Sequence, residues 1–410
     1  MIYSTRLTHT DKARWGVTMI LLAIAVLICG TGTPARGAFD CGSNGSDGAL
    51  TFPAPTTATT IDFDPASYNP PLDPDGDGVY HFTTVTIPPL LTLRFVPNKV
   101  GWNPIYWLCQ GDVVISGKLD FSGQAGHSPS DTVPGPLSVP GPGGFPGGWG
   151  RSPGIGVVYR TGFGPGQDSG AGLFSGNLFL LPLIGGNGGC GGGVAYGAKT
   201  GGGGAGGGAF LLASNTGIGI GGQILALGGN AGTSSDRGDG GAGGAIRLIA
   251  PTVSGAGTLS ALGGTGHEGN GQHGVVRIEA LNDDFTGSTI SDKVRRVALI
   301  TTGNNIFPSE GSQYARLVRI GGVALPVRTS GSFTVPDAAI NTDQPVLFEI
   351  EAHNIPLGTL FTVSLWNETM RQIEFQTSGL AGTLATSTAT ATHTIPSDYT
   401  RGYIYATWTK

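Results

Sequence analysis

A run of carboxylates at alternate positions is the clearest candidate for metal chemistry in this chain. Asp73, Asp75 and Asp77 are separated by single residues and are followed by Gly78. Carboxylate oxygens from one tight turn suit a hard cation such as Ca²⁺, as at the start of an EF-hand loop, and the glycine permits the bend. The position at which an EF-hand supplies a bidentate glutamate is Thr84 here, inside an expected strand. The three aspartates are therefore a candidate calcium site, and an acidic turn without metal is the alternative. No other cofactor is indicated.

Thiol chemistry depends on three cysteines that follow the first 37 residues, namely Cys41, Cys109 and Cys190. An odd number leaves at least one unpaired within the chain. Cys41 and Cys109 lie where glycine is less frequent, and they are the candidate disulfide in an oxidising compartment. Cys190, between glycines, would then remain a free thiol. A zinc site needs more ligands at closer spacing than these residues offer.

Catalysis on a polysaccharide would need paired carboxylates, or a carboxylate with an arginine, on one face of the fold. Most of the candidate side chains lie in glycine-rich segments, where polar residues are expected simply because loops face water. Arg247 and Arg277 take matching places in two related strands, and we expect them to point to solvent. No spacing specifies an acid and base pair, so no catalytic residue is assigned. The candidates are Asp236, Asp239, Arg247, His267, Glu268, His273, Arg277 and Glu279.

The elements that position these residues are indicated by a glycine-framed phrase of seven residues that occurs at 117–123, 222–228 and 257–263. Its first and last positions are glycine and its third is Leu or Ile. A short strand with alternating side chains and a glycine at each corner is what one rung of a coiled β-sheet needs. Residues 79–123 add consecutive strand patterns, rich in β-branched and aromatic residues. From 124 to 207 glycine and proline dominate, which predicts either loops or glycine-packed extended backbone.

The chain changes character after residue 284. Residues 285–410 contain few glycines, and strand patterns recur every 10–15 residues or so, which predicts a β-sandwich. Trp366, Tyr403, Tyr405 and Trp408 could stack on sugar rings from such a domain, although buried aromatic residues are commoner. We expect three parts: a leader at 1–37, a β-helix at 38–284 and the sandwich at 285–410.

The first 37 residues are typical of a secretory signal. Lys12 and Arg14 precede an apolar run at 15–28, and Ala35 to Gly37 offer small residues for cleavage. The apolar run is shorter than the roughly 20 residues that span a bilayer. Removal of this leader leaves 18 basic against 26 acidic residues, a net charge of −8, compared with −5 for the whole chain. A negative charge argues against nucleic acid or an anionic membrane as partner.

Several segments together resemble exported bacterial glycine-rich proteins. They are Phe39–Gly42, Asp77–Ile87, Gly111–Gly117, Phe179–Gly186 and Gly244–Pro251. The resemblance covers roughly residues 39–280 and implies a right-handed parallel β-helix similar to the pectate-lyase and filamentous-haemagglutinin folds. It also implies a bacterial, secreted or cell-surface location. It carries over no catalytic residue, because that group has no agreed active-site motif.

The expected fold is therefore all-β, with a right-handed parallel β-helix bearing glycine-rich loops and a C-terminal β-sandwich. The expected function is a non-catalytic structural or adhesive one, outside the cell or on its surface. Its candidate partners are a polysaccharide, a cell-surface component or further copies of the chain. The alternative is a polysaccharide lyase or hydrolase on the same scaffold.

Overall fold

A computed structural model describes the chain from residue 39 to residue 405, apart from short internal stretches. The expected leader, with its apolar run at 15–28, lies outside the described residues. Within the described part no helix has the length and apolar character needed to cross a bilayer. The internal stretches that are not described are 75–77, 129–136, 151–161, 165–166, 168–169, 182, 193–199, 234–237, 268, 301–305, 307–313, 326–337, 368–371 and 396–399.

The described chain is almost entirely β structure, with one short 3₁₀ turn, η1 (Pro65–Ser67), and one short helix, α2 (Pro97–Val100). Two parallel sheets occupy residues 48–298. Sheet A has nine strands: β1 (Gly48–Thr51), β3 (Val79–Ile87), β5 (Ile105–Cys109), β6 (Val113–Ile115), β8 (Ala209–Ser214), β9 (Gly217–Ile220), β11 (Ala245–Gly255), β13 (Val275–Phe285) and β15 (Lys293–Ala298). Sheet B has six strands: β2 (Thr59–Asp62), β4 (Leu91–Arg94), β7 (Lys118–Asp120), β10 (Gln223–Leu225), β12 (Thr258–Ser260) and β14 (Ser288–Ile290).

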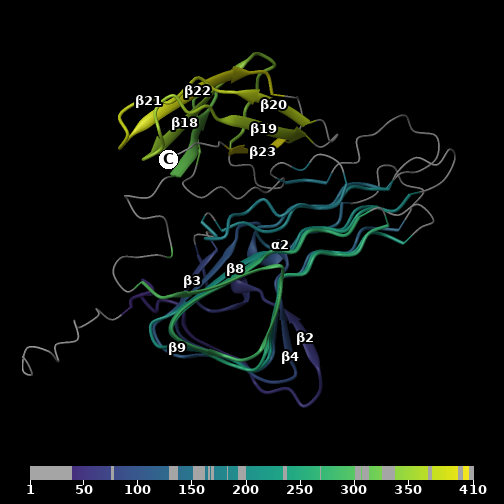
Figure 1. Ribbon diagram of the computed structural model, residues 1–410, viewed down its shortest axis with the longest axis vertical. Coiled ribbons are helices and arrows are strands. Elements are labelled where there is room, and N and C mark those ends of the chain that lie inside the picture. Colours follow the sequence, from purple (N-terminus) through teal and green to yellow (C-terminus); the bar gives the residue numbers. More distant parts are fainter. Residues whose placement is uncertain are drawn as a thin grey trace, which may run out of the picture. The chain divides into compact units, whose positions relative to one another are not determined.

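Six strands of sheet A close into a ring, in the order β3, β5, β8, β11, β9, β6. Two long strands close it, because each pairs with different neighbours at its two ends. Residues 79–82 of β3 pair with β5 and 85–87 with β6, while 245–249 of β11 pair with β8 and 252–254 with β9. The expected right-handed parallel β-helix is therefore wrong: the parallel strands form a closed six-stranded ring with a separate parallel sheet B. Figure 1 shows these strands around a three-sided outline.

The three glycine-framed phrases lie side by side in sheet B. Lys118 aligns with Gln223 and Thr258, and Leu119 aligns with Ile224 and Leu259. The third position of the phrase is fully buried in all three copies. The phrase therefore encodes one structural unit, whose branched residue points to the core while its neighbours point outward.

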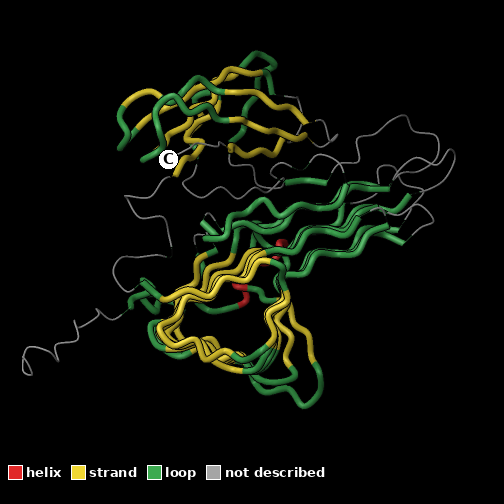
Figure 2. Tube along the Cα trace, viewed as in Figure 1, coloured by secondary structure: helices red, strands yellow, loops and turns green. Residues whose placement is uncertain are grey.

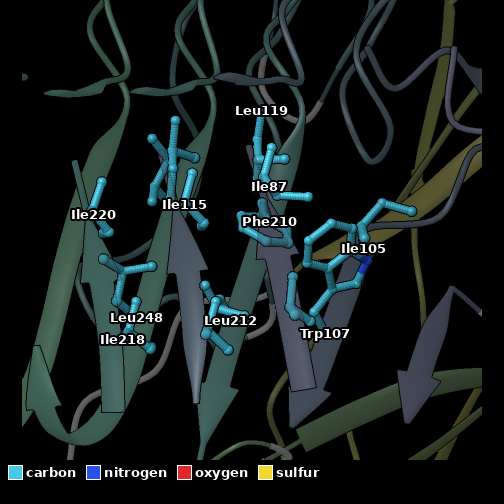
Figure 3. Packing of buried hydrophobic residues seen from close by; sticks show 14 of the residues in the cluster. Ile87, Ile105, Trp107, Ile115, Leu119, Phe210, Leu212, Ile218, Ile220 and Leu248 are labelled. Carbon is cyan, nitrogen blue, oxygen red and sulfur yellow. The ribbon is translucent and has the colours of Figure 1, made fainter. Parts of the chain in front are cut away.

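The core between the two sheets is apolar and contains a file of stacked rings. The ring of Phe95 lies 4.0 Å from that of Phe121, which lies 4.4 Å from that of Phe210, and both pairs are stacked. Trp107 is fully buried beside them and meets Phe210 edge to face at 5.4 Å. Around them, aliphatic residues from successive strands form layers (Figure 3). Burial of this apolar area is the main favourable contribution to folding.

The described parts of the glycine-rich segments are regular, hydrogen-bonded backbone, which is the glycine-packed alternative of the two that their composition left open. In the segment 202–208, the amides of Gly202, Ala205 and Gly208 donate to carbonyls in one neighbouring segment, at residues 127, 124 and 121. Gly203 and Gly206 donate to residues 148 and 145, and Gly204 and Gly207 donate to residues 239 and 242. A three-residue period is that of the polyproline II helix. Figure 2 shows these segments as extended green traces that run side by side. They form what we call the glycine lattice.

At several glycines of the glycine lattice, neighbouring backbone is too close for a side chain. A Cβ at Gly204 would lie 1.8 Å from the carbonyl oxygen of Gly229, and one at Gly206 would lie 1.7 Å from that of Gly186. The same holds at the corners of sheet B, where a Cβ at Gly222 would lie 1.8 Å from the carbonyl oxygen of Gly117. Glycine is therefore required at these positions by packing, whatever their backbone angles.

The C-terminal part consists of two antiparallel sheets. The first has five strands: β16 (Tyr314–Ile320), β17 (Val323–Ala324), β18 (Val346–His353), β21 (Ala381–Gly382) and β22 (Ser387–His393). The second has three strands: β19 (Thr362–Asn367), β20 (Gln372–Gln376) and β23 (Thr400–Tyr405). Both contribute to one apolar core, in which Phe348 of β18 meets Phe375 of β20 edge to face.

Replacement of Gly222 by alanine should lower the free energy of unfolding by about 3 kcal/mol, because the added carbon collides with the Gly117 carbonyl of the adjacent rung. The neighbouring Gly221 is the matched control, since its nearest atom would lie 4.0 Å from an added Cβ. Gly221→Ala should change stability by less than about 0.5 kcal/mol. Urea unfolding followed by circular dichroism measures both, and equal midpoints would contradict the packing described above.

Candidate functional site

The face of sheet A that points away from the core between the two sheets is covered by a second apolar cluster. Ala245 and Ile249 of β11 and Val275 of β13 belong to this second cluster. The residues that alternate with them on both strands belong to the core between the sheets. The covering residues lie before β8 or after β15 in the sequence. They are Phe174, Leu180, Leu183, Leu299 and Ile306. Leu180 and Leu183 belong to an apolar run, LFLLPLI at 178–184, and pack on this face of the sheet.

Two arginines and one glutamate lie under this cover. Arg247 aligns with Arg277 on the neighbouring strand, and Glu279 follows Arg277 on the same face. Arg247 Nε lies 2.7 Å and Arg277 Nε 2.8 Å from the same oxygen, Oε1 of Glu279. The side chains of Arg247 and Glu279 are only 2 % and 4 % exposed, so this ion pair is removed from water. The expectation that both arginines point to solvent is therefore wrong.

The covering segments also complete the hydrogen bonds of the two guanidinium groups. Arg247 donates to the carbonyl oxygen of Ile306 at 3.4 Å, and Arg277 donates to that of Leu178 at 3.3 Å. The ring of Phe179 lies 5.6 Å from the Arg277 guanidinium carbon. A buried charge is tolerated when it is paired and hydrogen-bonded, and the cluster meets both conditions. It fixes the covering segments onto the sheet.

General acid and base work on a glycoside needs two carboxyl groups, and among the described residues of the cluster Glu279 supplies one. One of its two carboxylate oxygens, Oε1, accepts from both guanidinium groups. The arrangement is that of a structural clamp.

The other candidate catalytic residues do not converge with it. Asp239 is buried in the glycine lattice, where its backbone amide donates to the Cys190 carbonyl and its carbonyl accepts from Gly204. His273 pairs with Asp292 at 2.9 Å, and His267 is exposed. Asp236 and Glu268 lie outside the described residues. The described candidates therefore lie in separate environments.

Of the candidate calcium ligands, only Asp73 is described. Its carboxylate accepts a hydrogen bond from the Gly78 amide at 2.9 Å, which is the bond that closes an acidic turn. Asp75 and Asp77 lie outside the described residues. Among the residues that the structure does describe, no three acidic, histidine or cysteine side chains form a metal-binding group. The calcium site stays a prediction.

The structure brings the two candidate disulfide cysteines together as free, buried thiols. Cys41 Sγ donates to the carbonyl oxygen of Cys109 at 3.3 Å, and Cys109 Sγ donates to that of Thr83 at 3.4 Å. Burial raises the pKa of the Cys41 thiol and raises the pKa of Cys109 to about 11. Cys190 is also buried, and its sulfur accepts a hydrogen bond from the Gly170 amide at 2.9 Å. The disulfide stays a prediction.

Sequence reasoning missed Lys293 and Arg295 on the last strand of sheet A. Arg295 aligns with Arg277 in the register of β13 and β15. The signal was present as a repeated pair, an aliphatic residue followed by arginine, at 246–247, 276–277 and 294–295. The sugar-stacking aromatics could not be placed, because Trp408 and the side chains of Trp366, Tyr403 and Tyr405 lie outside the described set.

Comparison with protein-family models, with curated proteins and with solved structures yields no match to this chain. The resemblance to exported glycine-rich proteins stays a prediction that none of these comparisons tests.

Loss of the Glu279 charge should be costly, because it would leave two buried guanidinium groups without a counter-ion. We expect Glu279→Gln to lower the free energy of unfolding by about 3 kcal/mol. Asp62→Asn is the matched control, since Asp62 pairs with Arg94 at 2.7 Å while its side chain is 35 % exposed. The control should change stability by less than about 1 kcal/mol. Similar losses in both variants by urea unfolding would show that the cluster is no clamp.

Peptide mapping without reduction should link Cys41 to Cys109 in protein recovered from an oxidising compartment. The thiol of Cys41 lies against the backbone of Cys109, whereas Cys190 is held in the glycine lattice. Formation should be slow without an oxidase, since only the thiolate attacks and burial raises both pKa values. A linked peptide that contains Cys190 would contradict this pairing.

Proposed function

We propose that this chain is a secreted or cell-surface, non-catalytic protein with a structural or adhesive function. It acts as a rigid scaffold whose side faces contact a surface or a polysaccharide. The observation that carries this proposal is the glycine lattice, in which successive amides of one segment donate to three different neighbouring segments. Such a lattice fixes backbone in three dimensions and leaves little room for side chains that could do chemistry.

The distribution of charge supports the same conclusion. Charged residues make up 12 % of the chain, against about 25 % in ordinary globular domains. The described arginines that adjoin the second apolar cluster serve to hold segments together. The location outside the cell rests on the leader-like first 37 residues and on the resemblance stated above.

The edge of sheet A at β15 is poorly suited to contact with further copies. At the last rung, Arg296 stands in register with the core residues Ile278 and Leu248. Its guanidinium carbon lies 5.7 Å from the ring of Phe285, and it pairs with Asp283 at 3.2 Å. A charge at a core position of the terminal strand discourages another sheet from stacking there. Self-association through this end is therefore the weaker form of the proposal.

A binding and turnover screen tests the proposal. The purified protein is incubated with neutral and acidic polysaccharides, with calcium and with chelator, and retention is measured by co-sedimentation. We expect retention without new reducing or unsaturated ends. Release of such ends would overturn the proposal in favour of a polysaccharide lyase or hydrolase, and loss of retention in chelator would implicate the aspartates at 73–77.

A further inference from the structure

Lys293 and Arg295 on the outer face of β15 are cations that form no ion pair with a described carboxylate. Lys293 and Arg295 stand two residues apart on this strand and align with Val275 and Arg277 of β13. Within the described part of the chain, neither forms an ion pair. The Arg295 side chain donates only to the carbonyl oxygen of Val294, at 3.2 Å, and is exposed. Lys293 Nζ lies 5.8 Å from the ring centre of Phe174.

This pattern differs from the rest of the described chain. Among the cations whose side chains the structure describes, five others each pair with a carboxylate of their own, and Lys118 on sheet B forms no such pair. The paired ones are Arg94, Lys99, Arg296, Arg316 and Arg319. Among the described cations, Lys293 and Arg295 are therefore two unpaired charges close together, on a chain whose net charge is −5.

The buried cluster adds to this excess. Arg277 shares the Glu279 carboxylate with Arg247, so two positive charges face one negative charge. The Arg277 side chain is 11 % exposed and lies under the ring of Phe179, which is itself 66 % exposed. The closest acidic residue along the chain, Asp292, pairs with His273. The result is a basic face with an exposed aromatic ring at its border, formed by Phe179, Arg277, Lys293 and Arg295.

The geometry points to this basic face as a binding site for an acidic polysaccharide, one that carries carboxylates along its chain. The inference rests on the proposed adhesive function and names the class of ligand. A guanidinium group takes a carboxylate through two parallel hydrogen bonds, which Arg295 can offer from its exposed position. Lys293 supplies a second charge about 7 Å away along the strand. The exposed Phe179 ring presents an apolar face on which a sugar ring can lie.

The negative net charge of the chain favours binding of an acidic polysaccharide at the basic face and not elsewhere. The negative net charge of the chain repels a polyanion, so the unpaired cations of the basic face determine where it can approach. A neutral polysaccharide would gain nothing from the cations. Duplex DNA and anionic membranes favour broader basic surfaces with many phosphate contacts.

Binding to polygalacturonate, a linear polymer of a carboxylated sugar, tests the inference in the full-length protein. Affinity electrophoresis or calorimetry should show that Lys293→Ala and Arg295→Ala each weaken binding about fivefold, and that the double variant weakens it about 25-fold. Phe179→Ala should also weaken binding. Lys118→Ala is the matched control, since it removes an unpaired charge from sheet B, and it should leave the affinity within about twofold. Thermal melting checks that all variants fold as the parent does.

Equal losses from Lys118→Ala and Arg295→Ala would overturn the inference, because binding would then follow net charge and not this face. Preferential binding of a DNA duplex or of phosphatidylserine vesicles, abolished by the same variants, would overturn it in favour of that other ligand. Retention of a neutral glucan that the variants leave unchanged would refute the basic face while the adhesive function stands. A protein that binds no glycan at all would refute the basic face together with the polysaccharide-binding form of the proposed function, and would leave the structural form.

Discussion

Contact between backbones without intervening side chains is the constraint on which the rest of this structure depends. In the segment 202–208, amide groups point in three directions in turn, and each direction meets a different segment of the chain. The donors and acceptors are satisfied without a sheet, so buried peptide groups are tolerated in a region with few apolar side chains. Glycine loses more conformational freedom on folding than other residues. The lattice is therefore stable only as a cooperative whole, joined to the parallel sheets from which its segments run.

The charged cluster of Arg247, Arg277 and Glu279 holds two covering segments on sheet A. The segment from 173 to 184 leaves the lattice region and must be held on the sheet by a small number of contacts. Leu180 and Leu183 supply apolar burial, while Arg277 binds the backbone of Leu178. The carboxylate of Glu279 orients the guanidinium group of Arg277 and that of Arg247, which in turn binds the backbone of Ile306. One buried acid thus positions two covering segments, and it leaves a surplus of positive charge beside them.

Local features of the fold could be predicted from the sequence, whereas its closure could not. The glycine-framed phrase predicts equivalent strands, and Leu119, Ile224 and Leu259 do align in sheet B. The pattern does not reveal that β3 pairs with β5 at one end and β6 at the other, or β11 with β8 and β9, because side chains alternate in the same way along the whole of each strand. Side-chain alternation correctly predicted that Arg247 points away from the core between the sheets. It wrongly predicted that Arg247 is exposed to solvent, since its side chain is 2 % exposed. The cover over that face comes from Phe174, Leu180, Leu183, Leu299 and Ile306, which are distant in sequence.

On β15, the last strand of sheet A, the face to which each charged side chain points determines whether that face can bind a partner. Arg296 stands at a core position of the last strand and protects the end of the sheet, because a second sheet would have to bury its charge. Arg295, its neighbour in sequence, points to the opposite face and pairs with no described carboxylate. Because adjacent side chains on a strand point to opposite faces, Arg296 opposes stacking of a second sheet while Arg295 is available to a ligand. On a chain of negative net charge, an unpaired cation held on a rigid strand gives a distant polyanion both a direction of approach and a fixed place to bind.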